Sequence, residues 1–339
     1  MKVILYGWQK NSTLYDGFVE NLTGSHVLSF LPPVFNRSYG DTADTYDSNS
    51  LLDKLDEYDL FVFTPRSLYD PNFRKALYHG TSAKKIFVDI EDDFLLRNVF
   101  KNEQIDLYFK REIITKLGAP EKFKWYLRNV YGSQLLPPIH RKLGIPANLS
   151  DSFPYKIATY RESESRLRPF PLTVRSEIIR TASPNVEKGT DLFFSQKLST
   201  VRTRKRYFKR LAEFANDSKD FKSVIRPGGL ARNEYYATLS GSKASVSLRG
   251  MGYDTDRYWE IPLFGSALFS EHLPIKIEND FLEGESALFF DDFSTFKEKF
   301  EKFVLLSDEW REIARNGRKL FLAHHTPKQR VSELVLDRL

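Results

Sequence analysis

The sequence predicts an α/β protein made of two successive Rossmann-like domains, each built around a parallel sheet. Short apolar runs alternate with stretches of helical spacing in both halves of the chain, and such strands with intervening helices form parallel sheets with right-handed crossovers. The alternation restarts after a stretch with two prolines in three residues, at 169–171. A chain of 339 residues is also too long for one ordinary core and suits two domains.

The first half alternates apolar runs with one clear helical stretch. Apolar runs bounded by turn residues predict strands at 2–8, 58–65, 84–90 and 105–112, with a helix at 13–22 after the first of them. Between residues 116 and 150, glycine, proline and aromatic residues mix without a sustained period. This region is expected to be a helical flap or a substrate-facing insertion.

The second half repeats the alternation and ends in a long helical stretch. Strands are expected at 190–196, 222–229, 243–250, 267–271 and 286–292, and helices at 202–217, 232–242, 256–266 and from 294 onward. We therefore expect an N-terminal domain, a linker, a second domain and a C-terminal helix that packs back on the first domain, with bounds 1–168, 169–189, 190–320 and 321–339.

Composition excludes several kinds of site. The chain has no cysteine, so disulfides, thiolate metal sites and cysteine nucleophiles are all excluded. The apolar run at the start is too short for a signal peptide, and no apolar stretch of about 18 residues occurs. We expect a cytoplasmic protein, with peripheral contact to a membrane as an alternative.

Positive charge is concentrated between Lys197 and Arg232. This stretch holds eleven basic and three acidic residues, a local charge of +8 in a chain whose formal net charge is +6. Such a field attracts phosphates, whether of a nucleotide, a nucleic acid or an anionic membrane. The alternative is an ordinary solvated helix face.

Arg257 and Glu260 are the pair that suggests a ligand site. Residues three apart share one face of a helix, and the helix that follows strand 243–250 begins at the carboxyl edge of the sheet, where open α/β folds bind ligands. An arginine there can clamp a diphosphate, and the glutamate can accept two ribose hydroxyls. Gly250 and Gly252 would allow close approach of the loop backbone. The alternative is an exposed ion pair beside ordinary loop glycines.

The stretch from Asp254 to Asp292 resembles the donor-binding segment of GT-B glycosyltransferases, in particular bacterial enzymes of the spore-maturation type. Phage DNA β-glucosyltransferases carry a similar Arg-x-x-Glu. The resemblance implies two Rossmann-like domains that face each other across a cleft, with Arg257 on the donor diphosphate and Glu260 on the donor ribose.

The resemblance is weaker over the strand at 190–196 and the helix that follows it, and in all it covers about residues 190–335. It implies that domain 1–168 lies on the acceptor side and that domain 190–320 binds the nucleotide sugar. It also implies that Arg202 and Arg204, which open the helix at 202–217, contact phosphate. The N-terminal half matches mainly in architecture. Its first loop departs from many GT-B enzymes, because Gly7 stands alone where they have a glycine-rich loop; Gly7 would still let a nucleotide or acceptor near the backbone.

The candidate base lies after the strand at 84–90. Asp89 ends this strand, and an inverting transferase needs a carboxylate or histidine to take the proton of the acceptor hydroxyl. The phage enzymes have a similar apolar strand that ends in a catalytic aspartate, so the resemblance implies Asp89 as base, with Asp92 as second choice. The alternative is that one of these acids caps the next helix and the others are solvated.

These observations predict a glycosyltransferase that moves a sugar from a nucleotide-diphosphate donor, UDP- or GDP-linked, to a hydroxyl. We expect inversion and no required cofactor or metal, since no Asp-x-Asp occurs in a strand-end setting. The acceptor stays open among glycan, lipid-linked sugar, protein and modified DNA. Alternatives are a nucleic-acid-binding protein that uses residues 197–232, a DNA-modifying transferase that combines both features, and a nucleotide-sugar epimerase or phosphorylase.

Overall fold

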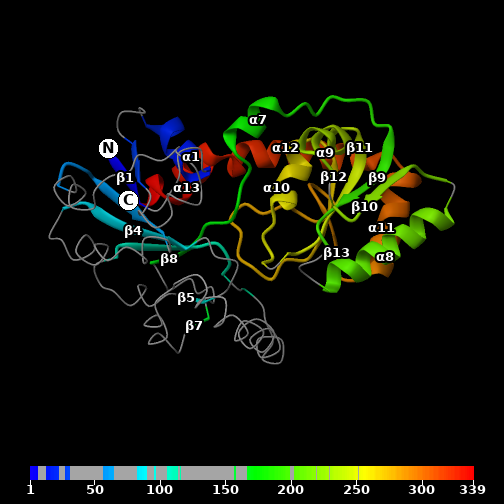
Figure 1. Ribbon diagram of the computed structural model, residues 1–339, viewed down its shortest axis with the longest axis horizontal. Helices are drawn as coiled ribbons and strands as arrows, with labels where there is room; N and C mark the ends of the chain where they lie inside the picture. The colour runs from blue at the N-terminus through cyan, green and yellow to red at the C-terminus, as the bar shows by residue number, and fades with distance from the viewer. Residues whose placement is uncertain are drawn as a thin grey trace.

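Two parallel sheets form the framework of the computed structural model (Figure 1). The structure describes residues 1–6, 13–22, 27–30, 56–64, 82–89, 95–96, 105–113, 115, 156–157, 166–198, 202–218, 220–228, 230–250 and 252–339. This architecture confirms the predicted α/β fold with a parallel sheet in each half of the chain.

The first sheet has six strands in the order β2-β1-β3-β4-β6-β8, and every neighbouring pair is parallel. The strands are β1 (Val3–Tyr6), β2 (Val27–Phe30), β3 (Leu60–Phe63), β4 (Lys84–Asp89), β6 (Leu107–Lys110) and β8 (Leu167–Pro169). Strands of a parallel sheet are covered on both faces, which explains why they read as continuous apolar runs. The four expected strands of this half are present.

Two strands of this sheet, β2 and β8, were not expected from the sequence. β8 ends at Pro169, beside the predicted start of the linker, and is followed by the short helix α7 (Ser176–Thr181). A separate antiparallel pair joins β5 (Leu95–Leu96) to β7 (Lys156–Ile157). The predicted insertion at 116–150 lies outside the described residues, and the domain bounds stay a prediction.

The second sheet has five parallel strands in the order β10-β9-β11-β12-β13. They are β9 (Thr190–Ser195), β10 (Ser223–Arg226), β11 (Ser242–Ser247), β12 (Ala267–Glu271) and β13 (Leu288–Phe290). Side chains of α8 (Arg202–Asp217), α11 (Phe293–Phe300) and α12 (Glu309–Leu320) share one apolar core with the sheet. Those of α9 (Arg232–Ser240) and α10 (Asp256–Leu263) pack in a second core on its other face.

The C-terminal stretch is a series of helices rather than one. Five-residue π-helical segments, Glu301–Leu305 and Phe321–His325, follow α11 and α12, and the chain ends in α13 (Pro327–Leu334) and a 3₁₀ turn (Leu336–Arg338). The Thr326 hydroxyl accepts a hydrogen bond from the Gln329 N–H at 3.3 Å, and proline occupies the first turn. These signals start a new helix after residue 325.

Helix α13 packs on the first domain, as expected. It lies beside α1 (Thr13–Asn21), and Val331 and Leu334 share an apolar core with Leu14 and Phe18 (Figure 1). A Cβ atom at Gly17 would lie 2.4 Å from the carbonyl oxygen of Pro327. A glycine is therefore needed where the two helices meet.

Candidate functional site

The first turn of α10 lies at the carboxyl edge of the second sheet, as the sequence predicts. Strand β11 ends at Ser247, the chain passes through a short loop, and α10 begins at Asp256. Because all five strands are parallel, the ends of β9, β11 and β12 lie along this same edge. Gly265, with φ of 72°, ends the helix in the left-handed conformation that favours glycine.

Arg257 is half-buried at this turn and directs its side chain toward the end of β9. Its Nε donates to the Ser195 carbonyl oxygen at 3.2 Å, and its guanidinium lies 5.7 Å from the centre of the Tyr235 ring. Within the described residues, its two terminal nitrogens have no hydrogen-bond or ion-pair partner. The side chain is thus oriented by one backbone contact, and its outer N–H groups are available to a ligand.

Glu260 lies one turn further and is buried, with 9% of its surface exposed. Its two oxygens accept hydrogen bonds from the hydroxyls of Tyr236 at 3.0 Å and Tyr235 at 3.1 Å, both on α9. Burial raises the pKa of the Glu260 carboxyl, while Arg257 and the two tyrosine hydrogen bonds oppose the shift. The expected shared face is present, and it contacts α9 rather than lying open to solvent.

Arg204 is buried close to Arg257 and shapes the loops of this edge. Its guanidinium donates to the carbonyl oxygens of Arg249 at 2.8 Å, Leu248 at 3.1 Å and Lys197 at 3.2 Å. Burial, and then the like charge of Arg257, lowers the pKa of Arg204 to about 10. Among the described residues, its hydrogen bonds go to backbone carbonyl oxygens, so a contact with donor phosphate stays a prediction.

Arg204 explains why one of the two loop glycines, Gly250, has no side chain. A Cβ atom at Gly250 would lie 3.0 Å from Arg204 Nη2, and the Gly250 N–H donates to the Gly252 carbonyl oxygen at 2.8 Å. Gly250 therefore makes room for a protein side chain, and close approach to a nucleotide stays a prediction for both glycines. Arg202 begins α8, and its side chain lies outside the described part of the structure, as does Gly7.

Gln196 is a residue of this edge that sequence reasoning missed. It lies between Ser195 and Lys197, whose carbonyl oxygens accept from Arg257 and Arg204 respectively. Gln196 is 1% exposed, and its amide oxygen and nitrogen have no hydrogen-bond partner among the described residues. Because buried amides are nearly always paired, the Gln196 amide is a candidate contact for a ligand at this edge. No sequence signal distinguishes it from an ordinary loop glutamine.

A buried cluster around Asp254 ties the start of α10 to the first half of the chain. Asp254 accepts from the Trp259 indole at 2.6 Å and from the Leu172 backbone N–H, and it lies 3.5 Å from Arg111 Nε. Glu112 accepts from the backbone N–H groups of Tyr253 at 2.6 Å and Asp254 at 3.0 Å. The loop that leads into α10, the helix of Arg257, is thereby fixed to the residues that follow β6.

Asp89 is placed at the end of β4, as expected, but in a fully buried ion pair. Its Oδ2 lies 3.2 Å from Lys110 Nζ, both side chains are 0% exposed, and the Tyr108 hydroxyl donates to the same oxygen at 2.7 Å. These contacts favour a role in joining β4 to β6. The base assignment stays a prediction for Asp89, and Asp92 lies outside the described residues.

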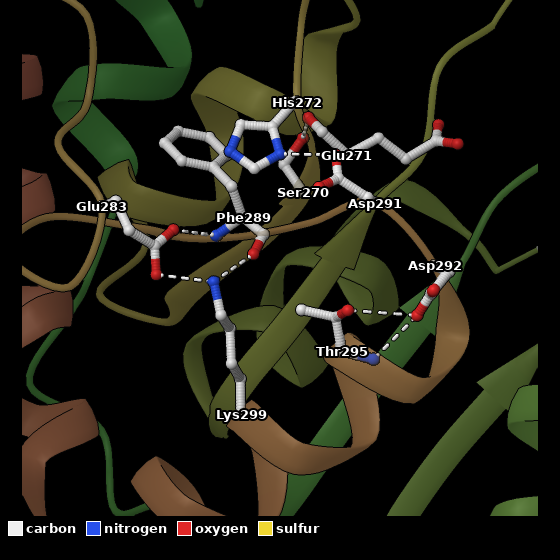
Figure 2. A network of polar contacts seen from close by, with 9 residues as sticks. All are labelled: Ser270, Glu271, His272, Glu283, Phe289, Asp291, Asp292, Thr295 and Lys299. Atoms are coloured by element: carbon white, nitrogen blue, oxygen red, sulfur yellow. Dashed lines mark hydrogen bonds and ion pairs between the residues drawn. The ribbon is translucent and has the colours of Figure 1, made fainter.

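Carboxylates at the ends of β12 and β13 have protein partners (Figure 2). Asp291 contacts His272 at 2.9 Å, Glu283 contacts Lys299 at 2.8 Å, and Asp292 caps α11 through the Thr295 N–H at 2.8 Å. Glu271 accepts from the Arg249 backbone N–H at 3.0 Å. Among the residues that the structure describes, no group of three or more histidine and acidic side chains could hold a metal ion.

Some cations of the basic stretch 197–232 contact other parts of the protein. Arg204 is buried, Lys209 lies 3.7 Å from Glu213, and the Arg210 guanidinium lies 4.5 Å from the centre of the Phe293 ring. Contact with an anionic surface stays a prediction. Among the described helices, none combines the length and the apolar composition that crossing a membrane requires.

The comparisons with known proteins place these features in a known fold. Residues 198–335 match a family described as glycosyl transferase-like. No curated protein sequence matches the chain. A glycosyltransferase from Rickettsia africae ESF-5 is similar in structure, with a TM-score of 0.53, 8% identity, and coverage of 98% of this chain and 96% of its own.

Two further solved structures are similar at low identity. S. aureus TarM aligns with a TM-score of 0.50 and 9% identity over 86% of this chain, which spans only 57% of TarM. HepE of Anabaena was solved with UDP-glucose, and its alignment covers 100% of this chain and 100% of HepE at 11% identity. Its TM-score of 0.47 is too low to indicate a shared ligand. The fold likeness confirms the GT-B arrangement. Residues 198–335 match the kind of family that the sequence predicts for this part of the chain.

Proposed function

We propose that this chain transfers a sugar from a nucleotide-diphosphate donor to a hydroxyl acceptor, with Arg257 on the donor diphosphate. The observation that carries the proposal is the guanidinium of Arg257, whose terminal nitrogens have no partner among the described residues at the carboxyl edge of the second sheet. This position lies inside the segment that matches the glycosyl transferase-like family. The spore-maturation type of enzyme is the proposed relative.

The charges around Arg257 support an anionic ligand. Burial, and then the like charge of the nearby Arg257, lowers the pKa of Arg204. Glu271 and Glu260 offset part of the positive charge, but no ion pair joins either arginine to a carboxylate in the described part of the chain. The outer N–H groups of Arg257 therefore stay available to a diphosphate, and the amides of the first turn of α10 would add to its binding.

The chemistry of transfer follows from this placement. The acceptor oxygen would form a bond to the anomeric carbon of the sugar. At the same time the bond between the anomeric carbon and the phosphate oxygen would break, and its electron pair would pass to that phosphate oxygen. Fixed positive charge that stabilises this leaving group is the kind of contribution that dominates such reactions. A base would take the acceptor proton, and we propose inversion without a metal; Asp89 serves as base only if its contacts with Lys110 and Tyr108 open.

A thermal-shift panel tests the proposal. The parent, Arg257→Ala and Arg315→Ala would be heated with UDP, GDP, dTDP, CDP and ADP, with and without Mg²⁺. Arg315 is the matched control, because it is an exposed arginine of α12 paired with Glu312. A nucleotide that binds the folded chain raises the midpoint of the parent and the control, and raises it much less for Arg257→Ala.

Other outcomes would decide against the proposal. If none of the nucleotides stabilises the parent, a nucleotide-sugar transferase is wrong. Binding of DNA that weakens steeply with salt would then favour the nucleic-acid alternative. If Arg257→Ala responds like the parent to the nucleotide that binds, the transferase class survives and the diphosphate assignment is wrong.

A further inference from the structure

The carboxylate of Glu260 has one tyrosine hydroxyl on each of its oxygens. Tyr236 donates to Oε1 at 3.0 Å and Tyr235 donates to Oε2 at 3.1 Å. An ionised carboxylate has two oxygens and about four lone-pair sites. Each oxygen of Glu260 therefore has one site in use and one that remains.

Packing holds both phenols in place. The Tyr236 ring stacks on Phe264, with centres 4.6 Å apart and planes at 10°. The Tyr235 ring lies 5.6 Å from Phe193 on β9 and carries the Arg257 guanidinium at 5.7 Å. Since these contacts hold the two tyrosine rings in place, their hydroxyls define where the Glu260 carboxylate points.

We propose that Tyr235 and Tyr236 are positioning residues: they keep Glu260 ionised and oriented, so that each carboxylate oxygen offers its remaining lone pair to one hydroxyl of a vicinal diol. The ribose of a nucleotide carries such a diol in its 2′ and 3′ hydroxyls. The inference rests on the proposed function, because it requires Glu260 to face a ribonucleotide. It adds that the tyrosines of α9, rather than Glu260 alone, set the preference for ribose.

The charged groups around Glu260 give this role a pH signature. On α10, Asp256 raises the pKa of Glu260 and Arg257 lowers it; on α9, Tyr235 and Tyr236 lower it through their hydrogen bonds, and Arg232 acts on Tyr236. Burial is the largest influence and raises the pKa. Removing a phenol hydroxyl would raise it further. Protonation puts a hydrogen on one oxygen, so acid weakens binding of the diol, and a variant without a hydroxyl loses binding at a higher pH.

The test is titration calorimetry with UDP and 2′-deoxy-UDP between about pH 5 and pH 8, a range that spans protonation of a carboxyl with a raised pKa. If GDP is the nucleotide that stabilises the parent, GDP and 2′-deoxy-GDP replace them. The parent should bind the ribonucleotide roughly tenfold or more tightly than the deoxy form, as one hydrogen bond to a charged acceptor allows. Tyr235→Phe and Tyr236→Phe should each reduce this preference and shift the loss of binding to higher pH.

The control variant is Tyr207→Phe. Tyr207 is a buried tyrosine of α8 in the other core of the same sheet, so its hydroxyl can be removed without contact with Glu260. This variant should keep the preference and the pH dependence of the parent. Glu260→Gln, which cannot titrate, should bind weakly, and its remaining pH dependence should be that of the terminal phosphate of the nucleotide, which also gains a proton in this range.

The outcomes separate this inference from the proposed function. If both phenylalanine variants are folded and bind UDP with the parent's pH dependence and ribose preference, the positioning role is wrong, although binding to the parent still supports a nucleotide-dependent transferase. If Tyr236→Phe does not fold, Tyr235→Phe and Glu260→Gln decide the question. If the parent binds no nucleoside diphosphate, the proposed function fails and the inference fails with it.

Discussion

The ion pair between Asp89 and Lys110 gives the sharpest prediction about the first domain. Asp89→Asn would leave the Lys110 ammonium beside a neutral amide in a site where both side chains are 0% exposed. Removing one partner of a buried ion pair costs about 3–5 kcal/mol, because the remaining charge has been taken out of water. We therefore expect Asp89→Asn to lower the free energy of unfolding by that amount.

The assay is urea unfolding of the parent, Asp89→Asn, Lys110→Met and the double variant, followed by circular dichroism. A double-mutant cycle isolates the pair, since the double variant removes both charges together. It should recover part of the lost stability, because neither charge is then left buried without its partner. Lys110→Met alone should be destabilised like Asp89→Asn.

Transfer activity in the same variants separates structure from catalysis. If Asp89 only joins β4 to β6, the double variant should regain activity together with stability. If Asp89 is the catalytic base, Asp89→Asn should stay folded and inactive, and Lys110→Met cannot restore it. An Asp89→Asn variant as stable as the parent would refute the reasoning from burial.

Three further predictions concern other parts of the structure. Gln196→Leu should stabilise the ligand-free protein by about 1–3 kcal/mol, because it removes two buried polar atoms that have no partner among the described residues. The same change should weaken nucleotide binding. A loss of stability in urea unfolding would contradict this prediction. Gly17→Ala should destabilise by about 1–3 kcal/mol through its clash with Pro327, while Gly189→Ala, with open space around its Cβ, serves as control for the same measurement. Burial raises the pKa of Asp280 to about 6, so the folded state binds the Asp280 proton more tightly than the unfolded state does. As the pH rises from about 4 to 7, the parent should therefore lose on the order of 2–3 kcal/mol of folding stability relative to Asp280→Asn. Equal slopes of the two proteins in pH-dependent unfolding would show that Asp280 is not the cause.

Local pattern was sufficient for much of the fold. Helix α8 occupies residues 202–217, as its apolar spacing predicts, and the apolar strands of both sheets lie where continuous hydrophobic runs occur. β2 is not apparent in the sequence because its apolar run is only four residues long, although Gly24 and Ser25 precede it and Pro32 and Pro33 follow it. β8 is not apparent because Pro169 indicates a connection. The C-terminal stretch was read as one helical region because its period continues through the two π-helical segments.

The candidate site depended on contacts that only the folded chain creates. The sequence places Asp89 at a strand end, but Lys110 becomes its neighbour only through the register of β4 against β6. The tyrosine contacts of Glu260 likewise arise when α9 packs beside α10, and the carbonyl contacts of Arg204 when two loops converge on it. Spacing within one helix could predict Arg257 and Glu260 as a pair. It could not predict the groups that surround them.

The loop between β11 and α10 links the proposed donor site to the rest of the molecule. Its last residues, Tyr253 and Asp254, are held through Glu112 and Arg111, which directly follow β6 of the first sheet, and through Leu172 after β8. Arg330 of α13 is also buried near Asp254, with its guanidinium 4.6 Å from the centre of the Trp259 ring. Because Trp259 lies between Arg257 and Glu260 in α10, a shift of the first domain or of α13 would act directly on the turn that carries both residues. The position of the proposed donor contacts is therefore coupled to the packing between the two halves of the chain, and not to the second sheet alone.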